Sequence, residues 1–156
     1  SFSELCDLAR ESQAFPSRVD VNADVFLAPE SMINAIQLEC ARTMQPVPQT
    51  PGELAEVIYQ SLAESYAKAI KELEQLTGIP YDEIHIVGGG SNAEYLNELT
   101  AEKSGLRVLA GPAEATAIGN LAAQMIAAGV FADYREARTC ILQSCEVKCY
   151  SHTSIT

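Results

Sequence analysis

The chain has 156 residues, of which 47% are hydrophobic and 20% charged, and its formal net charge is −11. This length and hydrophobic content suffice for the core of one globular domain and exclude a disordered chain. No apolar run reaches the ~20 residues of a membrane-spanning helix, and no signal-peptide pattern is present, so we expect a cytoplasmic protein without a membrane partner. The acidic charge also disfavours nucleic acid as a partner, although backbone N–H groups at a helix start can still hold a phosphate.

The five cysteines predict reduced thiols. Their number is odd, and no C-x-x-C pair occurs among them. Asp20, Asn22 and Asp24 alternate as metal ligands can, but the segment lacks the Gly and Glu positions of a calcium-binding loop. We therefore expect no metal site in the chain.

The first part of the chain is predicted to be helical around one irregular segment. A helical pattern begins at once, over residues 2–12, and the first residue is Ser1, so we expect a piece of a longer polypeptide. Residues 13–29 then show no sustained period and are rich in Pro, Asp and Asn. Pro29 opens a second helix, whose apolar face is expected to carry Met32, Ile33, Ile36 and Cys40.

The longest predicted helix begins at a capping box. Thr50 is its N-cap, Pro51 its first residue and Glu53 the acidic partner of the box. The helix is expected to end at Gly78, a natural left-handed stop, and its acidic residues are expected to face solvent.

Strands and helices alternate in the second part of the chain. The β-rich runs 84–87 and 106–110 flank a helix that Ser91 or Asn92 can cap, and this order predicts parallel strands. An Ala-rich helix over 113–128 has small residues suited to close packing, with Glu114 expected to support its start. A last helix, 134–142, and a strand, 146–150, complete an α/β chain that is rich in helix and has a small sheet.

The glycine run after the first strand is the candidate binding site. Residues 84–92 read IHIVGGGSN, so a strand stops in three glycines before a helix. Missing side chains let a ligand approach the backbone, and a helix start presents free N–H groups. A tight turn without a ligand is the alternative. His85 is interpreted as a structural strand residue, since no nucleophile lies near it in the sequence.

A dinucleotide-binding module is the second functional hypothesis. Gly88, Gly90 and Ala93 fit the G-x-G-x-x-G/A pattern of Rossmann domains. However, the second strand ends at Gly111 and Pro112 without an acidic residue for a ribose, and a long helical stretch precedes the first strand. A stand-alone nucleotide-binding module of this kind remains the alternative.

The wider pattern resembles the carboxyl-terminal domain of the FGGY carbohydrate kinases. Nearly the whole chain carries this resemblance, through FLAPESM at 26–32, QPVPQTPGELAEVIYQSLA at 45–63, HIVGGGS at 85–91, GPAEATAIGNLAAQ at 111–124 and EVKCY at 146–150. Within the family, the chain is most similar to the enzymes that phosphorylate L-rhamnulose at its 1-hydroxyl.

This resemblance implies an actin-like, ribonuclease-H-like fold, with residues 1–156 forming the carboxyl-terminal, nucleotide-binding part of the second kinase domain. Residues 13–29 correspond to a covering segment on the sugar-binding side. The implied cofactors are ATP and Mg²⁺, with ADP and a sugar as further partners. The residues implied to contact the nucleotide are Gly88, Gly89, Gly90, Ser91 and Asn92.

No catalytic residue is expected within this chain. In the family, the general-base Asp, the phosphate loop and most sugar contacts precede this region, so the fragment is expected to be inactive alone. It is also expected to self-associate through a face that the missing half would cover. The family commonly places an amide at the sixth position of GGGSQN, whereas this chain has Asn92 at the fifth and Ala93 at the sixth.

Overall fold

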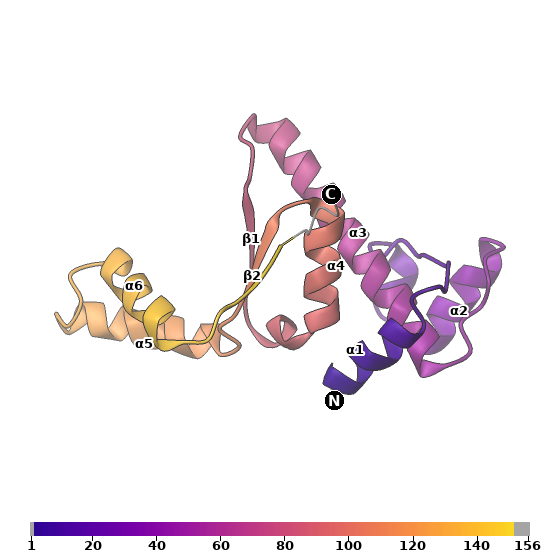
Figure 1. Cartoon of the computed structure of the whole chain (residues 1–156), viewed down its shortest axis with the longest axis horizontal. Coiled ribbons are helices and arrows are strands. Elements are labelled where there is room, and N and C mark those ends of the chain that lie inside the picture. Colours follow the sequence, from indigo (N-terminus) through magenta and orange to yellow (C-terminus); the bar gives the residue numbers. More distant parts are fainter. Residues whose placement is uncertain (1, 152–156) are drawn as a thin grey trace.

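The computed structural model describes residues 2–151, and Figure 1 shows their arrangement. The helices are α1 (Phe2–Glu11), α2 (Met32–Arg42), α3 (Pro51–Thr77), α4 (Glu94–Ser104), α5 (Ala115–Ala127) and α6 (Tyr134–Ser144). The strands are β1 (Glu83–Ile86), β2 (Arg107–Ala110) and β3 (Lys148–Tyr150), and short 3-10 helices span Asp24–Phe26 and Gly89–Asn92. None of these helices combines the length and apolarity needed to cross a membrane.

A three-stranded sheet, in the order β1-β2-β3, forms the centre of the molecule. β1 and β2 are parallel, with Ile84 opposite Val108, and β3 runs antiparallel to β2, with Lys148 opposite Ala110. Helix α4 connects the two parallel strands and packs on β2, where Val108 and Ala110 are buried. The predicted α/β fold, rich in helix with parallel strands in a small sheet, is confirmed.

The main core lies where α3 crosses α1 and α4 (Figure 1). Tyr59 of α3 meets Tyr95 of α4 edge to face, with ring centroids 6.2 Å apart. Arg10 of α1 lies over the same Tyr95 ring at 4.8 Å and pairs with Glu98. The apolar members of this core are Cys6, Ala9, Ala55, Tyr59, Ala63, Ala93, Tyr95, Leu96 and Leu99. The long helix therefore supports the sheet indirectly, through α4.

The long helix has its predicted caps, but not all of its acidic residues face solvent as predicted. Thr50 and Glu53 form the capping box, and Gly78 ends the helix with φ +69°. Glu56, expected on a solvated face, is instead fully buried and accepts a hydrogen bond from Gln60 Nε2 at 3.0 Å. That expectation was wrong because α1 and α4 both pack on α3 and enclose it on more than one side.

The second helix also differs from its predicted apolar face. Ser31, not Pro29, provides the N-cap, and its Oγ accepts a hydrogen bond from the backbone N–H of Asn34. Ile36 and Cys40 are buried as expected, against Val57 of α3. The predicted partners Met32 and Ile33, in the first turn of α2, are 46% and 54% exposed, so the start of this apolar face is not buried.

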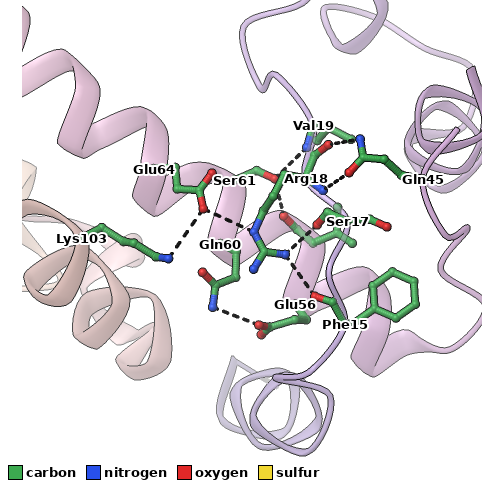
Figure 2. A network of polar contacts seen from close by, with 11 residues as sticks. Phe15, Ser17, Arg18, Val19, Gln45, Glu56, Gln60, Ser61, Glu64 and Lys103 are labelled. Carbon is green, nitrogen blue, oxygen red and sulfur yellow. Dashed lines mark hydrogen bonds and ion pairs between the residues drawn. The ribbon is translucent and has the colours of Figure 1, made fainter. Parts of the chain in front are cut away.

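Side chains hold the irregular segment 13–29 against α3 (Figure 2). The Gln45 side chain binds both backbone groups of Arg18, accepting from its N–H and donating to its carbonyl, each at 2.8 Å. Ser61 of α3 accepts the Val19 N–H at 3.0 Å. The Arg18 guanidinium lies 3.4 Å from Glu64, which also pairs with Lys103 of α4 at 3.6 Å. The segment is irregular but fixed at its middle.

Helices α5 and α6 form a pair at one end of the molecule (Figure 1). They contact each other, and Ala122 and Ala137 are the buried residues of the two helices. The small residues of α5 were expected to allow close packing, yet most of this helix is exposed or half-buried. Within residues 2–151, no other element covers its apolar side.

Candidate functional site

The glycine turn lies at the carboxyl end of β1. Gly88 adopts φ +80°, a conformation that favours glycine, and Gly89–Asn92 then form one turn of 3-10 helix. An added Cβ on Gly89 or Gly90 would meet no atom within 4 Å, and both residues are exposed. The first N–H groups of such a turn have no carbonyl partner inside it. Gly89 and Gly90 thus offer an open backbone surface.

A second turn, at the end of β2, faces the first. Gly111 and Pro112 are joined by a cis peptide bond. The Gly88 N–H donates to the Pro112 carbonyl at 3.0 Å, and the Gly111 N–H donates to the Ile86 carbonyl at 2.8 Å. These two hydrogen bonds hold the ends of the parallel strands together, so that both turns lie at one edge of the sheet.

A groove of about 410 Å³ runs along this edge. Its size falls within the range of small-molecule sites. Three stretches of chain contribute to it, and the lining residues are Ser91, Asn92, Glu94, Ala110, Gly111, Pro112, Ala113, Glu114, Ile118, Cys145, Glu146 and Lys148. Of the five residues predicted to contact a nucleotide, Ser91 and Asn92 line the groove, while Gly88, Gly89 and Gly90 form the turn beside it.

Ser91 and Asn92 have different surroundings within this turn. Ser91 is buried, and its hydroxyl donates to the Gly88 carbonyl at 2.7 Å. Fully buried Asn97 of α4 donates from Nδ2 to the Ser91 carbonyl at 2.9 Å, which fixes the turn on α4. Asn92 is exposed in the groove. The prediction that Ser91 or Asn92 caps α4 was wrong: Ala93 is the N-cap, without a side-chain hydrogen bond.

The charges of the groove suit the uncharged part of a nucleotide better than its phosphates. Three carboxylates, Glu94, Glu114 and Glu146, line it beside one ammonium, Lys148. Carboxylates accept hydrogen bonds from hydroxyl groups but repel phosphate. The groove therefore offers hydrogen-bond acceptors for hydroxyl groups beside an open glycine backbone, and among its described lining residues it has less positive charge than a triphosphate needs.

Lys148 forms an ion pair across the groove. Its Nζ lies 2.5 Å from Glu94 Oε1, at the first residue of α4. The Glu94 partner raises the pKa of the Lys148 ammonium, and Lys148 in turn lowers the pKa of the Glu94 carboxyl. Both side chains are about half exposed. Lys148 is therefore charged at neutral pH.

The remaining candidates lie outside this groove or have other roles. His85 sits on β1 with Nε2 2.8 Å from Glu83, whose pKa is lowered mainly by this contact. Glu114 is the N-cap of α5 but makes no side-chain capping bond there, so its expected supporting role is not seen. Among residues 2–151, no three His, Cys, Asp or Glu side chains converge as a metal site requires. The five cysteines are free thiols.

Sequence reasoning missed the groove residues that follow α6. These are Cys145, Glu146 and Lys148, which lie up to about 60 residues after the glycine turn in the chain. The pairing of β3 with β2 brings them to the groove. Their spacing carries no signal for this contact. The β-rich run at 146–150 was recognised as a strand, but its partner strand and direction could not be inferred from the run itself.

Comparison with known proteins identifies a family that the chain matches. Residues 3–128 match the C-terminal domain of the FGGY family of carbohydrate kinases. Proteins named rhamnulokinase from Bacillus subtilis and Enterococcus faecalis are each 46% identical to the chain over 99% of its length. The rhamnulokinase of Halalkalibacterium halodurans is 44% identical over 96% of the chain. The chain spans about a third of the length of these relatives (32%). None of these findings supports the Rossmann alternative.

Proposed function

Because this chain belongs to the FGGY family of carbohydrate kinases, we propose that it forms the carboxyl-terminal, nucleotide-binding part of an ATP-dependent sugar kinase. The proposed reaction converts L-rhamnulose and ATP to L-rhamnulose 1-phosphate and ADP. The names of its relatives and their identity over almost the whole chain support this substrate. A cytoplasmic location, where ATP is abundant, is part of the same proposal.

The observation that carries the proposal is the glycine turn beside the groove. Gly89 and Gly90 are open, and Gly88 has the positive φ that brings them to the edge of the sheet. A flat, uncharged base or a ribose can approach such a backbone closely. In the proposed enzyme, residues 88–92 and the groove form the wall that holds adenosine.

The rest of the chemistry belongs to the remaining two-thirds of the protein. Phosphoryl transfer depends on positioning and on stabilising charge at the transferred group. As the family resemblance implies, we assign the phosphate loop, the general-base Asp and most sugar contacts to the other part of the enzyme, together with Mg²⁺. Among the described groove residues, Lys148 is the one side chain with a positive charge. Segment 13–29 is proposed to cover the sugar-binding side.

Substitution of Gly89 tests the nucleotide role. In the full-length enzyme, Gly89→Val places a branched side chain on the open backbone, where it occupies the space of the nucleotide. We expect the KM for ATP to rise at least about tenfold, the effect of losing ~1.4 kcal/mol, and the KM for the sugar to stay nearly unchanged. Normal ATP affinity in a folded variant would refute the assignment.

Gly88→Ala is the matched control for a purely structural effect. Gly88 has φ +80°, so an added Cβ strains the backbone, whereas φ at Gly89 lies outside the left-handed region. We expect Gly88→Ala to lower the melting temperature, and Gly89→Val to leave it close to that of the parent enzyme. The two variants thus separate damage to the turn from loss of the ligand.

A further inference from the structure

Strand β3 places a positive charge in the groove. Lys148 begins β3 and lies opposite Ala110 of β2, whose backbone leads directly into the Gly111–Pro112 turn. This strand follows residue 128, where the match to the family domain ends. The family match therefore assigns no role to Lys148, and its position next to the glycine turn results from the sheet pairing seen here.

Lys148 is the sole Lys or Arg among the described residues that line the groove. Three carboxylates accompany it, so the lining carries an excess of negative charge. A nucleotide whose adenosine lies in this groove must direct its phosphates past these carboxylates. Neutral donors such as the Asn92 amide and backbone N–H groups can also contact a phosphate, but within the described lining only Lys148 can supply a charge-assisted hydrogen bond from a side chain.

We propose that Lys148 binds a phosphate group of the bound nucleotide, and that Glu94 holds the lysine in place until the nucleotide arrives. This inference rests on the nucleotide role proposed above. The Lys148–Glu94 ion pair is half exposed, and ion pairs of that kind contribute little to stability. A phosphate carries more charge and more acceptor atoms than a carboxylate, so it competes for the ammonium.

Glu94 then acts as a competitor of the phosphate, which gives the two residues opposite effects. Removing Lys148 removes the phosphate contact. Removing the charge of Glu94 frees Lys148 and also takes one negative charge from the groove. If the pair only fastened β3 to α4, both substitutions would loosen the groove and change affinity in the same direction.

Calorimetry of the full-length enzyme with adenosine and with ADP tests the proposal, since ADP differs by its phosphates. We expect Lys148→Met to weaken ADP binding about fivefold and to leave adenosine binding within about twofold. We expect Glu94→Gln to strengthen ADP binding about twofold to threefold. When Lys148→Met is also present, Glu94→Gln should give only a small part of this increase in ADP affinity.

Glu114→Gln is the control for charge alone. Glu114 lines the same groove and loses the same charge when substituted, but it is not paired with Lys148. Its effect on ADP binding should be smaller than that of Glu94→Gln and equal with and without Lys148→Met. An effect equal to that of Glu94→Gln would overturn the competitor role.

The other outcomes are equally decisive. Unchanged ADP binding by Lys148→Met, or an equal loss of adenosine and ADP, overturns the proposal. If Lys148→Met does not fold, Glu94→Gln carries the test, and unchanged or weaker ADP binding by that variant overturns it. If the unmodified enzyme binds neither adenosine nor ADP, the proposed nucleotide role itself fails. If adenosine binds normally and Lys148→Met leaves ADP binding unchanged, the phosphate role of Lys148 is refuted and the nucleotide role of the groove stands.

Discussion

At the scale of single residues, the glycines around the groove have two different tasks. Gly111 has φ +124°, and an added Cβ would lie 2.6 Å from the Glu146 carbonyl, so this position requires glycine for the fold. Gly89 and Gly90 have open space where a Cβ would go. Glycine is not needed there for packing within residues 2–151. Its presence fits the requirement of a ligand, which is the argument for the nucleotide wall.

Asn92 offers a side-chain test of the same wall. It is exposed and lines the groove. Whether its amide takes the place of the one expected at the next position, where this chain has Ala93, is what the substitution tests. We expect Asn92→Ala in the full-length enzyme to cost about 1 kcal/mol of nucleotide affinity, the usual contribution of one neutral hydrogen bond. Calorimetry with adenosine measures this change.

The control for Asn92→Ala is Asn120→Ala. Asn120 is also an exposed asparagine, but it lies on α5 and outside the lining of the groove. We expect it to leave nucleotide affinity unchanged. Equal affinities of the Asn92 variant and the parent enzyme would mean that only the backbone of the turn contacts the nucleotide.

Residue identity alone could not predict which polar groups are buried. Glu56 has the same local pattern as the exposed acids of α3, yet it is fully buried, and one of its oxygens has no hydrogen-bond partner among the described residues. Gln60 Oε1 and Asn97 Oδ1 are also buried without a hydrogen-bond partner among the described residues. Their burial depends on how α1, α3 and α4 meet, which periodicity along one helix does not encode.

At the scale of elements, local chemistry determines where the long helix begins. The Glu53 carboxylate accepts the backbone N–H groups of Gln49 at 2.7 Å and Thr50 at 3.0 Å. Hydrogen bonds to the ionised form favour that form. They lower the pKa of Glu53 below its usual value of 4.5, with the Gln49 contact as the largest cause.

This shift predicts a pH dependence of stability. The folded pKa of Glu53 lies below the unfolded one, so its contribution is fully present above the unfolded pKa and is lost as pH falls through the folded pKa. We expect the melting temperature of the full-length enzyme to decrease below about pH 4.5. Glu53→Gln, which keeps an acceptor oxygen but does not titrate, should show a shallower decrease. Identical slopes would contradict the prediction.

Helix ends with strong local signals were predicted from the sequence, and those set by tertiary contacts were not. Gly78 ends α3 with a positive φ, as predicted, and Gly105 ends α4 in the same way. The start of α4 was misplaced because the Ser91 hydroxyl binds Gly88 within the glycine turn instead of capping the helix. The glycine turn of the candidate site was found by sequence, but Lys148 was not, since strand pairing brings it there.

At the scale of the whole molecule, the proposed function makes the chain one wall of a nucleotide-binding cleft. We expect it to show no kinase activity alone, because the groups that position and stabilise the transferred phosphate are assigned to the rest of the enzyme. A coupled assay with ATP, Mg²⁺ and L-rhamnulose should give only background, with the full-length enzyme as the positive control. Turnover by the purified chain would contradict the division of roles.

The uncovered helix pair predicts association of the isolated chain. Leu121, Val130, Tyr134 and Leu142 of the α5–α6 region are each at least 50% exposed. Apolar surface of this kind favours self-association. Sedimentation velocity should detect dimers or larger species at moderate concentration, and Leu121→Glu should shift the distribution towards monomer. A clean monomer of the unmodified chain at the same concentration would contradict the prediction.

The groove is completed late during translation, because part of its lining comes from the segment that leads into the antiparallel strand β3 and from β3 itself. Ser91 and Asn92 leave the ribosome well before Cys145, Glu146 and Lys148, yet all of them line the same groove. A nascent chain that has reached α5 can pair β1 with β2 and form the glycine turn, but one side of the groove is still missing. A ligand that requires that side can bind and stabilise the protein only after β3 has been translated and has paired with β2.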